Sequence, residues 1–262
     1  MGTTYRNGCQ VQNDTRVIRA IKTAIADALS RPVIGRAVAW FFRNRVPWAG
    51  GRLLVDPAVC GARTVASAFF GFYEHSERRL IRRHLLDIDT VELGSSVGGV
   101  TAESARKLGR QRALVCVEAN PNLQWILAQN IQSFASHLKV LVVPKAVAYS
   151  GTLVKFSIAA NSSDSRLSQK DGDDGSISIE AVSLRELPGV DAMNRCQLVC
   201  DIEGGEWDIV ANEHELLSRC ERIIAEVHGA NMVVSFDRFC DCLSKLGFRL
   251  LGRDGYVGAF GR

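Results

Sequence analysis

Short apolar runs alternate with amphipathic segments along most of the chain, and this alternation predicts a sheet of strands covered by helices. The apolar runs predict strands over residues 90–93, 113–118, 140–143, 196–202 and 222–227. Apolar positions at helical spacing predict helices over residues 75–84, 101–108, 123–134, 206–217 and 233–246. Uniformly apolar strands are typical of parallel strands buried on both faces. With a hairpin-like pair over residues 248–260, the pattern predicts an α/β fold, a mostly parallel, doubly wound sheet with a C-terminal antiparallel strand.

The N-terminal part of the chain has a different pattern. Apolar positions predict one amphipathic helix over residues 17–29 and a second that starts after Pro32, followed by a loop over residues 47–51. We therefore expect residues 1–65 to form a helical N-terminal extension and residues 66–262 to form the main domain.

The second of these N-terminal helices combines Trp40 and Phe41 with the basic residues Arg36 and Arg43. A basic helix with aromatic residues can lie on a membrane surface. The alternative is a helix that packs against the domain with its arginines in water, which is the commoner arrangement. The sequence leaves both interpretations open, and membrane-surface contact is a hypothesis at this point.

Two other segments have a polar character. The predicted helix over residues 75–84 carries several charges, which we expect to form a solvated face: Glu77, Arg78, Arg79, Arg82 and Arg83. The stretch 161–178 is rich in Ser, Asp and Gly, which predicts a loop beside the site or a linker.

Composition narrows the classes of function. With 262 residues, of which 47% are apolar, the chain can form one large domain with a full core. A net charge of +4 is low for a nucleic-acid-binding protein, so no nucleic-acid partner is expected. The eight cysteines include no paired CxxC motif, so no metal site is expected. No apolar run reaches the roughly 20 residues that span a bilayer, and no signal peptide is visible. These features predict a cytoplasmic protein, with at most peripheral membrane contact.

The loop after the first main strand reads VELGSSVGG over residues 91–99. Gly94 and Gly98 allow a sharp turn from strand to helix, and they let a ligand approach where a Cβ atom would collide. The exposed N–H groups at such a turn favour an electron-rich partner. Glu92, just inside the strand, can bond the amino group of a methionine moiety. These residues predict a nucleotide-type cofactor site.

The end of the second strand supports this site. Glu118 can accept hydrogen bonds from two ribose hydroxyls. Enzymes that use NAD have a carboxylate with the same function at this position. A dinucleotide fingerprint would place glycine where Ser96 stands, so Ser96 favours a cofactor without pyrophosphate. Asn120 is either a further cofactor contact or only the cap of the following helix. Ala146 lies where an adenine edge would be.

A second, acidic loop reads DIEGGE over residues 201–206. Asp201 or Glu203 could remove a proton from a hydroxyl group during catalysis, because crowded carboxylates raise one another's pKa. Glu206 is also explained by the dipole of the helix that it starts. His228 follows the fifth strand at the same sheet edge, and it is either a base or a satisfied polar group. Asp201, Glu203 and His228 are therefore the candidate catalytic residues.

Together these motifs resemble the FkbM family of S-adenosylmethionine-dependent methyltransferases. The likeness rests on the four segments 91–98, 117–121, 201–206 and 226–228, in that order and spacing. It implies a class I methyltransferase of Rossmann-like fold that binds S-adenosyl-L-methionine. It also implies methylation of a hydroxyl, most often on a sugar of a glycan or glycolipid, and otherwise on a polyketide or similar small molecule.

The chain departs from the family pattern at three positions. Glu92 stands where an aspartate is usual, and Ala119 stands where proline is usual. Val199 replaces a frequent lysine two residues before Asp201. Two other classes of function stay open: an NAD-dependent oxidoreductase, and a non-catalytic binding protein on the same fold. The sequence does not name the acceptor or the oligomeric state.

Overall fold

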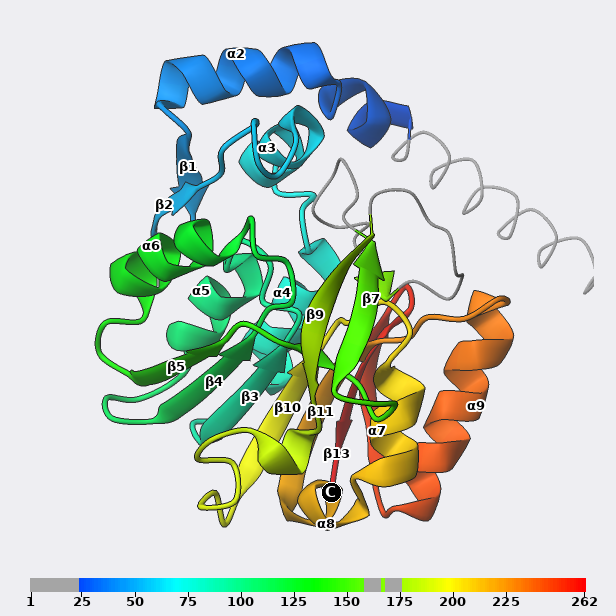
Figure 1. Ribbon diagram of the computed structural model, residues 1–262. Helices are drawn as coiled ribbons and strands as arrows, with labels where there is room; N and C mark the ends of the chain where they lie inside the picture. The colour runs from blue at the N-terminus through cyan, green and yellow to red at the C-terminus, as the bar shows by residue number, and fades with distance from the viewer. Residues whose placement is uncertain (1–23, 158–165, 168–175) are drawn as a thin grey trace, which may run out of the picture.

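A seven-stranded sheet forms the centre of the computed structural model, which describes residues 24–157, 166–167 and 176–262 (Figure 1). Its strand order is β12 (Arg249–Asp254), β13 (Val257–Gly261), β11 (Cys220–Glu226), β10 (Cys196–Cys200), β3 (Asp89–Leu93), β4 (Ala113–Val117) and β5 (Lys139–Val143). β13 runs antiparallel to β11 and β12, and the other pairs are parallel. This confirms the predicted α/β fold, a mostly parallel Rossmann-like sheet with a C-terminal antiparallel strand.

Helices cover both faces of the sheet because the strands present apolar side chains on both sides. They are α4 (His75–His84), α5 (Gly99–Ala105), α6 (Gln124–Phe134), α7 (Glu206–Asn212), α8 (His214–Arg219) and α9 (Met232–Lys245). Val91 and Leu93 pack in one buried cluster with residues of α7, α8 and α9. Leu114 and Cys116 pack in another with residues of α4 and α5. The sheet is therefore doubly wound, as the sequence predicts.

The predicted helix over residues 206–217 is two helices, α7 and α8. The break falls at Glu213, which is 3% exposed. Its carboxylate accepts a hydrogen bond from the backbone N–H of Leu184, 3.0 Å away. Leu184 opens a short 3-10 helix, η2 (Leu184–Glu186). A buried carboxylate needs such a partner, and this long-range contact is not visible in a helical pattern.

The N-terminal part combines helices with a hairpin. Residues 24–29 are helical, and the remainder of the helix predicted over 17–29 lies outside the described residues. The other elements are α2 (Pro32–Phe42), β1 (Arg45–Trp48), β2 (Gly51–Leu54) and α3 (Ala62–Phe69). Of the loop predicted over residues 47–51, residues 49–50 form a turn, whereas the others belong to β1 and β2. The extension is therefore not wholly helical. α3 runs across residue 65, where we divide the chain, so that division stays a prediction.

Contacts with the main domain explain the hairpin. The indole N–H of Trp48 donates to the carbonyl of Gly99, and Asn130 exchanges hydrogen bonds with both backbone groups of Leu54. Asn130 also donates to the carbonyl of Val97. These bonds tie the hairpin to the start of α5 and to α6. Both helices flank the loop over residues 94–98, which we call the cofactor loop after the role predicted from its sequence.

A second, small sheet lies beside the carboxyl ends of the main strands (Figure 1). Its order is β6 (Ala146–Val147), β9 (Ser176–Val182), β7 (Leu153–Ser157) and β8 (Arg166–Leu167). A loop is predicted over residues 161–178, but residues 166–167 form β8 and residues 176–178 belong to β9. Residues 161–165 and 168–175 lie outside the described part of the chain. Among the helices that the structure describes, none has the length and apolar character to cross a bilayer.

Candidate active site

A cavity of about 490 Å³ lies at the carboxyl ends of the central strands. In an open α/β sheet this edge, where the strand order reverses, is the usual ligand site. The loops after β3, β4, β10 and β11 each contribute to its wall. The small sheet contributes Ala146 and Phe156, and the chain before and within α4 contributes Tyr73, Glu74 and Glu77. The four sequence segments singled out above therefore converge on one cavity.

Gly94 joins the cofactor loop to the acidic loop. Its φ of +80° is in the left-handed region, and a Cβ atom there would lie 1.8 Å from the carbonyl oxygen of Asp201. The backbone N–H of Asp201 in turn donates to the carbonyl of Leu93, 3.0 Å away. Only glycine permits this approach, because any side chain would collide with the neighbouring backbone.

A hydrogen bond joins the backbone of Ser96 to the side chain of Glu118 in the cavity wall. The Glu118 carboxylate accepts hydrogen bonds from the backbone N–H groups of Ser96 (2.6 Å) and Asn120 (2.7 Å). The Ser96 hydroxyl lies 3.0 Å from the phenol oxygen of Tyr73. Burial raises the pKa of Glu118, and the two backbone hydrogen bonds oppose that rise. The loop and the strand end are thereby held in one fixed geometry.

Three of the residues assigned to cofactor binding lie behind this wall. Glu92 is 1% exposed and accepts a hydrogen bond from the Thr101 hydroxyl, while its Oε2 atom has no partner among the described residues. Burial raises the pKa of Glu92 to about 7. Gly98 starts α5 with a φ of +85° and packs near Leu127. Asn120 is buried, and its side-chain oxygen accepts from the backbone N–H of Asn122 in the turn before α6. The predicted cap is wrong, because α6 begins at Gln124 with Leu123 as its N-cap residue and without a side-chain cap bond.

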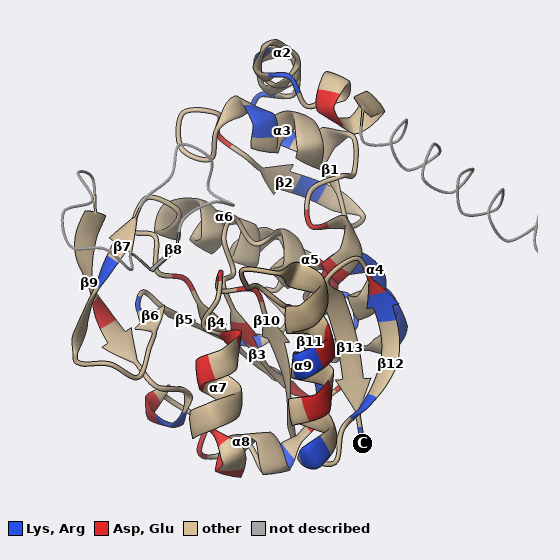
Figure 2. Cartoon of the chain, turned by 90° about the vertical axis from the view of Figure 1, so that its right-hand side faces the viewer, with Lys and Arg blue, Asp and Glu red and all other residues tan. Residues whose placement is uncertain are grey.

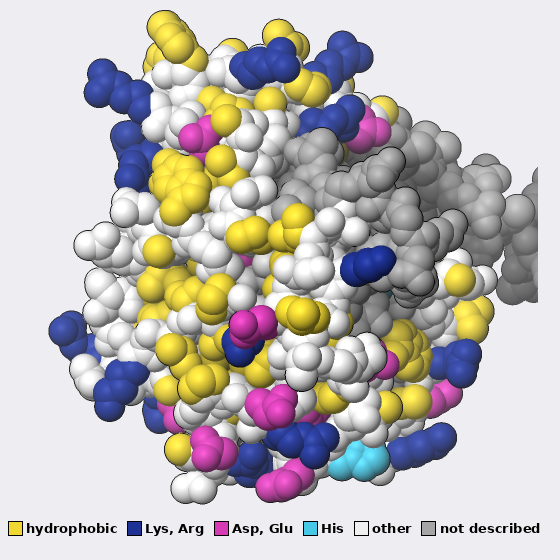
Figure 3. Space-filling view, viewed as in Figure 1, with side chains coloured by type: hydrophobic (Ala, Val, Ile, Leu, Met, Phe, Trp, Pro, Cys, Tyr) yellow, Lys and Arg dark blue, Asp and Glu magenta, His cyan; other side chains and the backbone are white. Residues whose placement is uncertain are grey.

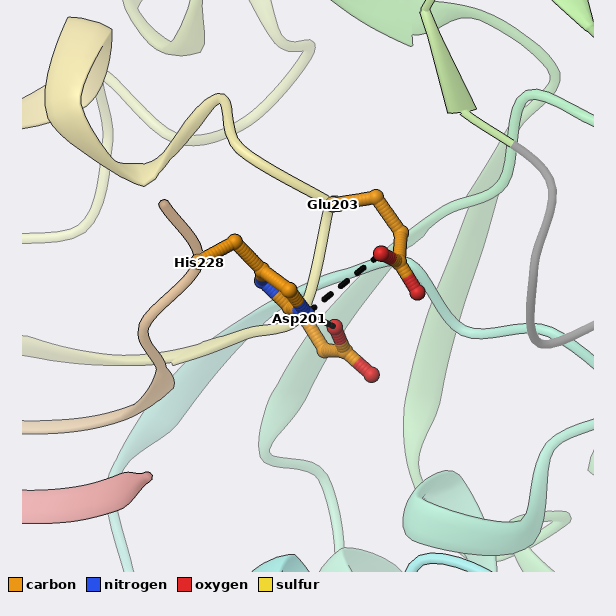
Figure 4. Close-up of side chains that lie close together, drawn as sticks. All are labelled: Asp201, Glu203 and His228. Carbon is orange, nitrogen blue, oxygen red and sulfur yellow. Dashed lines mark ion pairs between the residues drawn. The ribbon is translucent and has the colours of Figure 1, made fainter. Parts of the chain in front are cut away.

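Asp201, Glu203 and His228 meet on the opposite side of the cavity (Figure 4). The Nε2 atom of His228 lies 3.4 Å from the Glu203 carboxylate and 3.9 Å from the Asp201 carboxylate. Its Nδ1 atom lies 3.2 Å from Glu206, which is 1% exposed. The structure therefore brings the three candidate catalytic residues together, with Glu206 behind them.

Glu206 positions this group. Its carboxylate accepts hydrogen bonds from the backbone N–H groups of Ile202 and Gly204 as well as from His228. Glu203 adopts a φ of +56°, which is uncommon for a residue with a side chain. The buried carboxylate thus fixes both the acidic loop and the orientation of the imidazole ring. The sequence explained Glu206 by a helix dipole, and the structure gives it this additional task.

The pKa values follow from this crowding. Burial and the charge of Glu226 raise the pKa of Asp201 to about 8, although His228 opposes the shift. Burial lowers the pKa of His228, but the hydrogen bond to Glu206 and the nearby carboxylates outweigh it and raise the pKa to about 9. In an interval near pH 8 to 9, an ionised Asp201 can therefore face a protonated His228.

Three further acidic residues of the cavity wall, Glu74, Glu77 and Glu226, were not identified as site residues from the sequence. Glu77 of α4 is 6% exposed and lines the cavity with Glu226, the last residue of β11. Burial and a hydrogen bond with Glu226 raise the pKa of Glu77 to about 10. The prediction of a solvated face is wrong for Glu77 and Arg78, because that side of α4 packs over the sheet and α5. It is confirmed for Arg79, Arg82 and Arg83, which are exposed. Arg78 bonds the buried Glu103 and lies over the Trp48 ring.

These side chains also have the spacing of cation ligands. Donor atoms of Asp201, Glu203 and His228 lie within 4.8 Å of one another, and so do those of Glu77, Asp201 and Glu226. Carboxylate and imidazole groups are ordinary ligands of divalent metals. Figure 2 shows acidic positions gathered around the ends of the central strands. The region can hold a positively charged group, whether it is an imidazolium, a ligand or a metal ion.

The comparisons with known proteins concern the architecture. No protein-family model and no curated protein matches the chain. Among solved structures it is similar to precorrin-6y C5,15-methyltransferase from Geobacter metallireducens, with 13% identity and a TM-score of 0.39 over 71% of this chain and 86% of that one. A protein in the NADB-Rossmann superfamily from Streptococcus agalactiae has 9% identity and a TM-score of 0.41, over 71% and 67%.

A third similar structure is Streptococcus pneumoniae Sp1610 in complex with S-adenosyl-L-methionine, with 10% identity and a TM-score of 0.38 over 71% of each chain. At these identities and TM-scores, none of the likenesses carries an argument about activity or substrate. The fold rests on the sheet itself. Its strand order, with antiparallel β13 between β11 and β12, is that of the class I methyltransferase fold predicted from the sequence.

Proposed function

We propose that the protein is an S-adenosyl-L-methionine-dependent methyltransferase that acts on a hydroxyl group. The observation that carries this proposal is the carboxyl-rich lining of the cavity. Six carboxylate residues line it: Glu74, Glu77, Glu118, Asp201, Glu203 and Glu226. Among the described residues of the wall, Lys145 is the one Lys or Arg. Such a wall suits a cofactor that carries a sulfonium and an ammonium group.

The same carboxyl-rich lining disfavours the oxidoreductase alternative. NAD carries a pyrophosphate, which needs N–H donors or cations and would here face carboxylates. Ser96 also stands where a dinucleotide fingerprint has glycine, and its side chain occupies the wall at the loop. Both features support the methyltransferase proposal over an NAD enzyme.

The wall offers a cradle that fits S-adenosyl-L-methionine. Gly94 and Ser96 would lie against its methionine part, with Glu92 beneath them. Glu118 would accept from the ribose hydroxyls, and Ala146 would lie at the adenine edge. The cofactor supplies an electrophilic methyl group on sulfur. The chain contributes by holding an acceptor hydroxyl in line with that group, which accounts for much of the acceleration in such displacements.

Asp201 is the general base in this proposal. In this proposal the acceptor oxygen would take the methyl group that the cofactor supplies, sulfur would keep the electron pair of the broken bond, and the hydroxyl proton would pass to Asp201. His228 is less suited to the task, because its raised pKa keeps it protonated at neutral pH. Its imidazolium instead stabilises the carboxylates of Asp201 and Glu203. The sequence left this choice open, and the contacts favour Asp201.

His228 also supplies the positive charge that a divalent cation would otherwise bring to the acidic loop. We therefore expect the rate to be unchanged after dialysis against a chelator. A loss of activity that magnesium or manganese restores would assign Asp201, Glu203 and His228 to a metal instead.

For the acceptor, we infer a sugar hydroxyl of a glycan or glycolipid, which rests on the resemblance to the FkbM family. A polyketide or similar small molecule is the alternative. Transfer of a labelled methyl group to a panel of both classes would decide between them. A protein that binds the cofactor but transfers its methyl group to no acceptor would favour the non-catalytic alternative.

The first experiment is calorimetric titration of the purified protein with S-adenosyl-L-methionine, S-adenosylhomocysteine and NAD. We expect binding of the first two, weakened about ten- to hundredfold in Glu118→Gln, because a hydrogen bond to a charged group contributes about 1.5–3 kcal/mol. Glu215→Gln, on the exposed surface of α8 and not part of the cavity wall, is the matched control. Binding of NAD alone would overturn the proposal.

A further inference from the structure

The outer face of α2 is an exposed apolar surface. Val33, Trp40 and Phe41 lie on it at helical spacing, with exposed fractions of 67%, 82% and 72%. Figure 3 shows hydrophobic side chains projecting at the top of the molecule, where α2 lies in Figure 1. Aromatic side chains are usually buried, so a Trp and a Phe side by side in water mark a surface that binds something.

Packing of the helix does not account for this face. α2 already buries its opposite side, with Val38 and Ala39, against the N-terminal part of the chain. Gly35 allows that contact, because a Cβ atom there would lie 1.7 Å from the carbonyl oxygen of Ala62 at the start of α3. The helix is therefore apolar on two sides, and among the residues that the structure describes only one of these sides has packing partners.

Basic residues surround this face. Residues 24–65 contain two acidic residues, Asp27 and Asp56, and six arginines: Arg31, Arg36, Arg43, Arg45, Arg52 and Arg63. All of these arginines except the half-buried Arg45 are exposed. An apolar helix face bordered by arginines is complementary to an anionic lipid surface, because the rings can enter the acyl boundary while the guanidinium groups meet headgroups.

A line of aromatic rings connects this face to the cavity. Phe41 contacts Phe42, Phe42 contacts Phe69, and Phe69 contacts Phe70, each with ring centroids 5.0 Å apart. Phe70 is stacked on Phe72 at 6.3 Å, and Phe72 lines the cavity. We call these five residues the aromatic strip. The strip is partly exposed along its length, so an apolar surface leads from α2 to the cavity wall.

We propose that the outer face of α2 docks on an anionic lipid bilayer and that the aromatic strip faces the same bilayer. Docking in this way presents the cavity to an acceptor anchored in lipid. The docking itself is independent of the proposed methyl transfer. The presentation of a lipid-borne acceptor rests on the proposed methyl transfer. Among the acceptors proposed above, this presentation favours the glycolipid.

The test is sedimentation of the full chain with vesicles of phosphatidylcholine alone and of phosphatidylcholine mixed with phosphatidylserine. We expect binding to the mixed vesicles, weakening as salt is raised. The double variant Trp40→Ser, Phe41→Ser should bind at least about tenfold more weakly, because it removes two large apolar anchors. Arg36→Glu with Arg43→Glu should abolish the preference for the anionic vesicles. Trp125→Ser is the matched control, since Trp125 is 48% exposed on α6, and it should bind as the unaltered chain does.

Several outcomes would overturn the docking proposal. The first is no binding to the mixed vesicles, and the second is equal binding by the Trp40 and Phe41 double variant. A third is a dimer of the unaltered chain that becomes monomeric in the double variant without any vesicle binding, because a second copy would then cover the face. Calorimetric titration of the same preparations with S-adenosyl-L-methionine distinguishes a failure of the docking proposal from a failure of the proposed function. Cofactor binding should survive in every α2 variant. If the unaltered chain does not bind the cofactor, the methyltransferase proposal is contradicted and the docking proposal is not.

Discussion

The carboxylates on the two sides of the cavity have different kinds of partner. On the side of β3 and β4, the Glu118 carboxylate bonds backbone N–H groups, which fixes the loop. On the side of β10 and β11, Asp201 faces Glu203 and Glu226, and its Oδ1 atom has no hydrogen-bond partner among the described residues. A carboxylate satisfied by backbone donors holds geometry, whereas carboxylates that face one another exchange protons at reachable pH values. We therefore propose that the side of β3 and β4 binds the cofactor and that the side of β10 and β11 carries the reaction.

The largest expected effect comes from removing the proposed base. Asp201→Asn keeps the size of the side chain but cannot accept the proton, so the turnover number should fall by about 10²–10⁴-fold. Binding of S-adenosyl-L-methionine should survive, because its contacts lie on the other side. The measurement is steady-state kinetics beside calorimetry, with Glu203→Gln as the matched variant that should lose less. Full activity in Asp201→Asn would end the assignment.

The junction of the two sides should be the next most sensitive point. Gly94→Ala places a methyl group on the Asp201 carbonyl, so it should lower the free energy of unfolding by at least about 3 kcal/mol. Gly50→Ala is the matched control, with a φ of +82° but nothing within 4 Å of the added Cβ atom. It should cost about 1–2 kcal/mol from backbone strain alone. Urea denaturation of both variants gives the difference, and equal losses would contradict the close approach.

The reactive side should also show in the pH profile. Asp201 acts as a base only when ionised, and its pKa is raised to about 8 by burial and Glu226, with Glu203 and Glu206 adding to the shift and His228 opposing it. The rate should therefore rise with pH, approaching tenfold per unit below pH 8, and level off above it. Measurements of kcat/KM from pH 6 to 9 would test this. A rate independent of pH in that range would place the base elsewhere.

The smallest expected effect concerns stability. Burial and Glu226 raise the pKa of Glu77 from its ordinary 4.5 to about 10. The folded state therefore binds more protons than the unfolded state between these values, and stability falls as pH rises through that interval. Glu77→Gln removes this dependence, so the variant should be more stable, on the order of 1–3 kcal/mol at pH 7.

The stability difference between Glu77→Gln and the unaltered chain should grow with pH, which melting temperatures at pH 5, 7 and 9 would check. Glu215→Gln, on the exposed surface of α8, is the control and should change stability by less than about 0.5 kcal/mol. A difference that stays constant with pH would mean that Glu77 is ionised in the folded protein.

The sequence by itself determined the layers of the fold and the edge at which the site lies. Strand and helix periodicity are local properties, so the parallel sheet and its C-terminal antiparallel strand could be predicted from the order of apolar runs. Because parallel strands place their carboxyl ends at one edge, the sequence also located Ser96, Glu118, Asp201 and His228 on the same side. The chain before residue 66 lacked such repeating units, and its hairpin was missed.

Only the tertiary structure decided which side chains meet. Glu77 belongs to a helix that looks solvated by its charges, and it enters the cavity because α4 packs that side over β11. Gly94 needs to be glycine because of Asp201, more than a hundred residues later. Glu92, Gly98 and Asn120 have the right spacing but support the wall from behind. Such contacts depend on how distant elements pack, and packing at close range is set by the whole fold rather than by local pattern.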